Sequence, residues 1–125
     1  MLSFSQVIQL FNSLFDWLKL AAGEKGRLDA ETRAALLKVY VASNETKAYV
    51  TGLKLRKHAD REREARLARL WTEAAVALRH LDRDLADKCL LQGDALAGSM
   101  NWSHAQIDDA RNHINEVFQH ARKLL

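Results

Sequence analysis

The sequence predicts an all-α fold, an antiparallel four-helix bundle with an additional short helix between the third and fourth main helices. Its 125 residues include no proline and five glycines, and these two residue types most disfavour a helix interior. Apolar residues recur at helical spacing along most of the chain, with short loops between most segments. Hydrophobic residues make up 48% and charged residues 28%, as in globular proteins rather than disordered ones. The length suits one domain spanning residues 1–125.

The first predicted helix spans residues 4–22 and has a wide apolar face. On a helix of 3.6 residues per turn, its large apolar side chains, including Leu10 and Trp17, fall within roughly half of the circumference. One neighbouring helix cannot cover so wide a face, so we expect this helix to pack between two others. A helix lying on a membrane surface is the alternative, but the polar half is nearly neutral rather than lysine-rich.

The second predicted helix begins after an N-cap at Asp29 and runs to about residue 57, with Gly52 in its interior. This helix carries two apolar stripes on different sides. A helix that is apolar on two sides is either central in its bundle or shared with a second chain. A chain this small offers too few helices to surround it, so we expect self-association or a protein partner. The first apolar stripe contains Ala35, Val39, Ala42, Tyr49 and Leu53, and the second contains Leu37, Val41, Ala48 and Leu55.

These two helices predict a partner-binding surface. The first helix contributes because half of its circumference is apolar, and the second because both of its sides are. The predicted partner-binding residues are Val39, Ala42, Tyr49, Leu53, Leu10 and Trp17.

The third predicted helix has an N-cap at Asp60 and runs to about His80 with one continuous apolar stripe. Because no glycine lies between residues 58 and 60, a single bent helix through both segments is an alternative. The stretch 54–69 around this junction holds seven Lys or Arg and three Asp or Glu. The net charge of +3 therefore originates in this one stretch.

The basic stretch permits an alternative function, nucleic-acid binding through contacts with phosphates. Carboxylates are interleaved with the basic residues, and the stretch has no aromatic residue to stack on a base. A solvated helix end is therefore the simpler interpretation. The residues that nucleic-acid binding would use are Lys54, Arg56, Lys57, Arg61, Arg63, Arg66 and Arg69.

The additional short helix is predicted after the third main helix. Asp82 is suited to cap a helix over residues 83–92 that ends at Gly93. The chain's one cysteine, Cys89, lies on the apolar side of this helix. We expect it to be a core residue rather than a nucleophile, because no catalytic signature surrounds it. A loop over residues 93–102 follows.

The last main helix carries the clearest local signal in the chain. Ser103 and Gln106 have the spacing of a capping box, so the helix begins at the residue after Ser103. His113, Glu116 and His120 share one face of this helix and are residue types that bind transition metals. Since no matching ligand pattern occurs on another helix, we expect a solvated face and no metal site.

The sequence contains no phosphate loop, nucleophile signature or cysteine-rich metal motif. We therefore expect a non-enzymatic helical module for protein–protein interaction or assembly that self-associates and needs no cofactor. A single cysteine fits a reducing compartment. No apolar run reaches the roughly 18 residues of a membrane span, and the N-terminal segment lacks the pattern of a secretory signal. These features predict a cytoplasmic protein.

Overall fold

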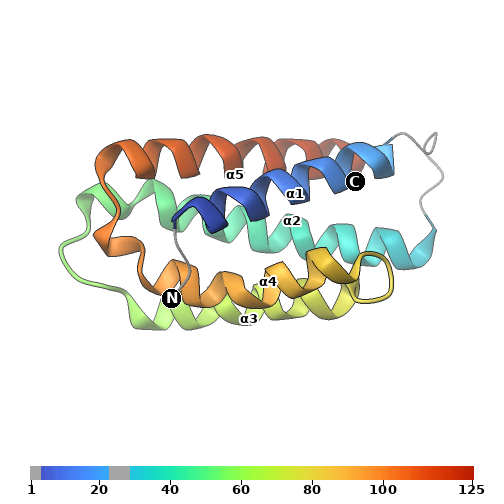
Figure 1. Ribbon diagram of the computed structural model, residues 1–125, viewed down its shortest axis with the longest axis horizontal. Helices are drawn as coiled ribbons and strands as arrows, with labels where there is room; N and C mark the ends of the chain where they lie inside the picture. Colours follow the sequence, from blue (N-terminus) through green and yellow to red (C-terminus); the bar gives the residue numbers. More distant parts are fainter. Residues whose placement is uncertain (1–3, 23–28) are drawn as a thin grey trace.

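The computed structural model describes residues 4–22 and 29–125, and this part of the chain is all-helical, as the sequence predicts (Figure 1). It forms five α-helices and two short 3₁₀ turns, without a strand in the described ranges. The α-helices are α1 (Phe4–Ala22), α2 (Ala30–Thr51), α3 (Arg61–Leu78), α4 (Arg83–Ala97) and α5 (His104–Leu124), and the 3₁₀ turns are η1 (Leu53–Leu55) and η2 (Ser99–Asn101).

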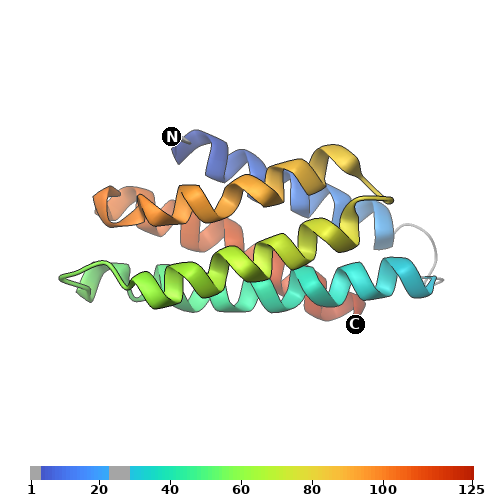
Figure 2. The same cartoon turned by 90° about the horizontal axis from the view of Figure 1, so that it is seen from below.

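The five helices pack side by side in a ring, and successive helices run in opposite directions (Figures 1 and 2). Around the ring the order is α1, α4, α3, α2 and α5, and α5 contacts α1 again. Neighbours in the ring are antiparallel except α1 and α5, which run parallel. Because α4 is a full member of the ring, the predicted division into four main helices and one short helix is not confirmed in detail.

Two glycines behave differently from the prediction. Gly52 ends α2 instead of lying in its interior, and its N–H donates to two carbonyls of the last turn. Gly93 lies within α4, which continues to Ala97 and so occupies half of the predicted loop. An interior glycine costs about 1 kcal/mol relative to alanine. Complete burial of Leu96 in the added turn offsets that cost.

The helices α2 and α3 are separate. The alternative of a single bent helix through both segments is therefore wrong. Arg56, directly after η1, has extended backbone angles (φ −85°, ψ 130°). The third helix then begins after Asp60 and ends at Leu78, close to the predicted end.

All four predicted N-caps are formed, and each side chain accepts a hydrogen bond from the first helical turn. At the last helix, the Ser103 N–H also donates to the Gln106 side chain (2.9 Å), which completes the predicted capping box. The backbone donors are Thr32 to Asp29 (2.7 Å), Arg63 to Asp60 (3.0 Å), Leu85 to Asp82 (3.0 Å) and Gln106 to Ser103 (3.1 Å).

The wide apolar face of α1 is buried against α4 and α5, as predicted for a helix between two others. Phe11, Leu14 and Leu18 on this face are completely buried. Trp102, just before α5, packs edge-on against Phe4 with ring centroids 5.2 Å apart. Helix α1 therefore packs along α5, and the contact between Phe4 and Trp102 adds to this packing at the N-terminal end of α1.

A buried polar network lies where α2 meets α3. The Trp71 Nε1–H donates to Thr46 Oγ1 (2.9 Å), and the Tyr49 hydroxyl donates to a Glu64 carboxylate oxygen (3.2 Å). Burial raises the pKa of Tyr49, and its protonated hydroxyl is the donor in this contact. Arg61 binds the other Glu64 oxygen at 3.2 Å. The buried carboxylate is thus stabilised from two sides, which a buried charge requires.

We expect Ser103→Ala to lower the free energy of unfolding by about 1 kcal/mol, because the Gln106 N–H in the first α5 turn loses its acceptor. Thermal denaturation should show a decrease in Tm of about 4 °C. Asn112→Ala, an exposed change in the same helix, is the control and should leave Tm unchanged or slightly raised. Equal losses for both variants would contradict the role of the cap.

Candidate functional site

The six residues predicted to bind a partner lie in the core of the folded chain. Their burial contradicts the expectation that they form an open surface. The reason is the ring of five helices, which covers the apolar faces that four helices would leave uncovered. Their exposed fractions are 0% for Val39, Ala42 and Tyr49, 2% for Leu10, 4% for Leu53 and 9% for Trp17.

The second apolar stripe of α2 is the one that faces solvent. Leu37 is 50% and Val41 is 37% exposed, and Ala48 is also exposed. Together with the exposed Asn44, these residues form a line along α2 with steps of four, three and four residues. We call Leu37, Val41, Asn44 and Ala48 the outer row of α2. Such spacing is that of the seam between two paired helices.

On one side, the outer row is bordered by ion pairs to α3. Lys38 Nζ lies 3.4 Å from a Glu73 carboxylate oxygen, and Arg66 Nη2 lies 3.1 Å from a Glu45 carboxylate oxygen. Lys38 and Glu45 carry opposite charges one heptad apart on the same edge of the row. The row is thus apolar along its middle and charged with both signs at this margin.

On its other side, the outer row is bordered by aromatic contacts to α5. Tyr40 stacks on Phe118 with ring centroids 5.2 Å apart, and Lys47 Nζ lies 4.7 Å from the centre of the same Phe118 ring. These contacts fix the two side chains beside the row, so its shape is set within the chain itself.

The basic stretch is largely engaged within the chain. Lys54 pairs with Asp108 at 2.7 Å, while Arg61 and Arg66 bind Glu64 and Glu45. The hydrogen bond from Lys54 lowers the pKa of Asp108. The guanidinium groups of Arg56 and Arg63 lie 4.5 and 5.6 Å from the centre of the Tyr49 ring.

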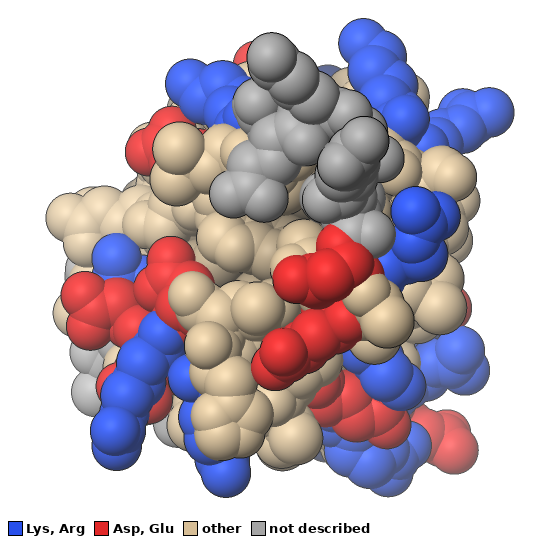
Figure 3. Space-filling view, turned by 90° about the vertical axis from the view of Figure 1, so that its right-hand side faces the viewer, with Lys and Arg blue, Asp and Glu red and all other residues tan. Residues whose placement is uncertain are grey.

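Five of the seven residues proposed for nucleic acid therefore contact other side chains of the chain, and Lys57 and Arg69 are exposed. The nearby surface hollow on α3 is lined by Asp60 and Glu62 as well as by arginines. At the opposite end of the bundle, Figure 3 shows acidic and basic side chains interspersed. The two carboxylates in the α3 hollow do not favour a surface built for phosphates.

The α5 residues of types that bind metals, His113, Glu116 and His120, do not come together around one point. His113 Nδ1 lies 2.8 Å from the Asp109 carbonyl oxygen and 3.2 Å from its carboxylate. His120 instead packs edge-on against Phe15 of α1, with ring centroids 5.0 Å apart. Over residues 4–22 and 29–125, no three His, Cys, Asp or Glu side chains are grouped so that they could hold a metal ion.

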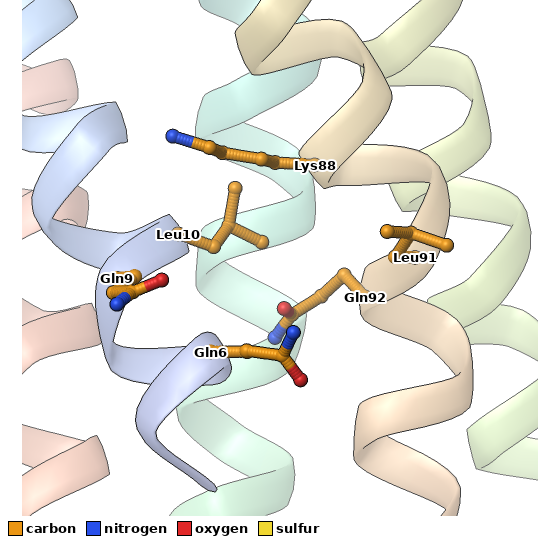
Figure 4. A pocket seen from close by; sticks show the side chains of 6 residues that line it. All are labelled: Gln6, Gln9, Leu10, Lys88, Leu91 and Gln92. Atoms are coloured by element: carbon orange, nitrogen blue, oxygen red, sulfur yellow. The ribbon is translucent and has the colours of Figure 1, made fainter. Parts of the chain in front are cut away.

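A cavity between α1 and α4 was not predicted from the sequence. It has a volume of about 130 Å³ and is lined by two hydrophobic and four polar side chains. In Figure 4, Gln6 and Gln92 point toward each other across it, and Lys88 reaches from α4 toward α1. Lys88 Nζ donates to Ser13 Oγ at 3.1 Å. The lining residues are Gln6, Gln9, Leu10, Lys88, Leu91 and Gln92.

Gln92 is the unusual residue of this cavity. Its side chain is 1% exposed, yet its Nε2 has no hydrogen-bond partner. A buried donor without a partner costs about 1–3 kcal/mol. The sequence does contain a signal for it, because Gln92 continues the buried line of Leu85 and Cys89 at helical spacing. A polar residue at a core position of α4 could have been found by periodicity.

Comparison with known proteins gives no match among family models, curated proteins or solved structures. Within the ranges that the structure describes, no helix combines the length and the apolar character needed to cross a membrane.

The free thiol of Cys89 is completely buried, as predicted for a core residue, and burial raises its pKa to about 12 from its ordinary value of 9.0. The folded state thus keeps the proton that the unfolded chain loses above pH 9. We expect the free energy of unfolding to fall between pH 9 and 12, with about 1 kcal/mol lost from this group at pH 10.

Urea denaturation between pH 7 and pH 10 measures this effect. Cys89→Ala is less stable at every pH because it leaves a cavity, but its stability should decline less steeply with rising pH than that of the original chain. Parallel pH profiles for the two proteins would rule out Cys89 as the source.

Proposed function

We propose that this chain is a non-enzymatic helical module for protein–protein interaction that self-associates through the outer row of α2. The observation that carries the proposal is the exposure of Leu37 and Val41 in a line with seam-like spacing. The lack of a catalytic motif in the sequence and the burial of the single thiol support a binding role rather than a catalytic one.

A second copy of the chain is the occupant that fits the outer row. In an antiparallel pair of α2 helices related by a two-fold axis, Leu37 lies opposite Ala48 of the partner subunit, and Val41 opposite Asn44 of the partner subunit. Large side chains then meet small or polar ones, so the two rows are complementary in shape.

The same register is complementary in charge. It brings Lys38 beside Glu45 of the partner subunit, and the two-fold axis repeats this contact. Because Lys38 already pairs with Glu73 and Glu45 with Arg66 within each chain, the new contact joins them into a line of alternating charge. Networks of this kind fix the orientation of paired helices more than they add affinity.

The apolar part of this interface is small, so the expected affinity is moderate. Burial of a leucine or valine contributes about 1.5–3 kcal/mol per side chain, and association costs several kcal/mol in lost freedom. With two such residues from each copy, we expect dissociation constants of about 1–100 μM.

We expect the double variant Leu37→Glu and Val41→Glu to be monomeric, because it places four carboxylates in the apolar middle of the interface. Sedimentation velocity or light scattering should give a mass near 14.2 kDa for this variant and about 1.5 to 2 times that value for the original chain at about 100 μM. Leu90→Glu is the matched control, since Leu90 on α4 is 47% exposed; it should still associate. A monomeric original chain at this concentration would overturn the proposal.

Charge reversal tests the proposed register. Lys38→Glu or Glu45→Lys alone should weaken association about tenfold, because like charges then face each other at two symmetric contacts. The double reversal should restore it. Glu73→Gln and Arg66→Gln control for the ion pairs that each reversal breaks within the chain, and they should have smaller effects. If the double reversal associates no better than the single changes, the antiparallel register is wrong.

A further inference from the structure

From the α1–α4 cavity we infer a second site, one that binds a small organic carboxylate. The Gln92 amide would donate a hydrogen bond to a carboxylate oxygen, and Lys88 would supply the opposite charge. The aliphatic part of the ligand would lie against Leu10 and Leu91. This site is independent of self-association, because α2 lies across the ring from the α1–α4 edge.

Gln92 indicates that the ligand carries a hydrogen-bond acceptor. Its side chain is almost fully buried, projects from α4 toward α1 in Figure 4, and has a free Nε2 donor. Leu85, Cys89 and Leu96 occupy the other buried positions of α4. An apolar residue would have served packing alone at position 92, whereas an amide gains from an acceptor that enters the cavity.

Lys88 indicates that the acceptor is anionic. Its ammonium group donates to Ser13 at 3.1 Å, and it forms no ion pair with a described residue. No carboxylate lines the cavity, so a cation has no charged ligand there, whereas the Lys88 ammonium group at its rim attracts an anion more strongly than a neutral molecule. A carboxylate can accept from the Gln92 amide and also attract the Lys88 ammonium group.

The surroundings limit the charge and the size of the ligand. Beyond Lys88, the adjoining hollow is lined by Asp16, Asp82 and Asp84, which would repel a polyanion but tolerate a single negative charge. The cavity volume of about 130 Å³ is close to the roughly 150 Å³ that holds benzene in an engineered protein. Butyrate and pentanoate, with six and seven non-hydrogen atoms, are therefore suitable probes.

Titration of the isotopically labelled chain with sodium butyrate, followed by two-dimensional NMR of backbone amides, tests this site. We expect saturable shifts confined to α1 and α4, with a dissociation constant of about 1–10 mM for so small a ligand. Butyramide, the neutral analogue, and sulfate, a divalent anion, should each bind at least about tenfold more weakly. Pentanoate should bind as well as butyrate or better.

Two variants connect the binding to the named side chains. Lys88→Gln and Gln92→Leu should each weaken butyrate binding about tenfold, whereas Lys123→Gln, at the end of α5, should not change it. Gln92→Leu removes a buried unpaired donor, so it should be at least as stable as the original chain. If it fails to fold, the exposed Lys88→Gln still decides the outcome.

The inference is overturned if butyrate produces no saturable shifts up to about 50 mM, if butyramide binds equally well, or if neither variant at position 88 or 92 changes the affinity. The monomeric variant Leu37→Glu with Val41→Glu should bind butyrate as the original chain does. Loss of self-association and loss of carboxylate binding are thus measured separately.

Discussion

The half-cylinder of large apolar side chains on α1 is the constraint on which the arrangement of the other helices depends. A face this wide can be removed from water only by two neighbours. The structure supplies them with α4 on one side and α5 on the other. α4 packs against both α1 and α3, and its continuation through Gly93 adds Leu96 to the core. The ring of five helices follows from this requirement.

Where α2 meets α3, polar side chains rather than apolar ones determine the local structure. Glu64 is buried, and a buried carboxylate is stable only with strong donors around it. Tyr49 and Arg61 provide them, and Arg56 covers the Tyr49 ring. The sequence suggests that the basic stretch 54–69 is a free surface, but two of its arginines contact the buried residues Glu64 and Tyr49. The chain's excess of positive charge is thus tied largely to its own folding.

Local signals in the sequence predicted the local structure well. The caps at Asp29, Asp60, Asp82 and Ser103 depend on a few adjacent residues, and all four are formed. Gly52 was predicted inside a helix but ends α2, whereas Gly93 was predicted to end a helix but lies inside α4. Both predictions were wrong because the end of a helix depends on what the next turn can bury. Periodicity found two apolar stripes on α2 but could not decide which one faces the core, since that depends on the number of surrounding helices. Gln92 was missed because the predicted helix ended there.

The packing of α1 against α4 and α5, two helices far along the sequence, has a consequence for synthesis of the chain on the ribosome. Both helices that cover α1 come from residues 83–124. After α1, some hundred further residues must be translated before both helices that bury its apolar face are complete. Translation of this length takes about 5–20 s at ordinary rates. During that interval Phe11, Leu14 and Leu18 lie on a nascent segment without their native neighbours. Apolar surface that is exposed for this long makes a newly made chain prone to aggregate.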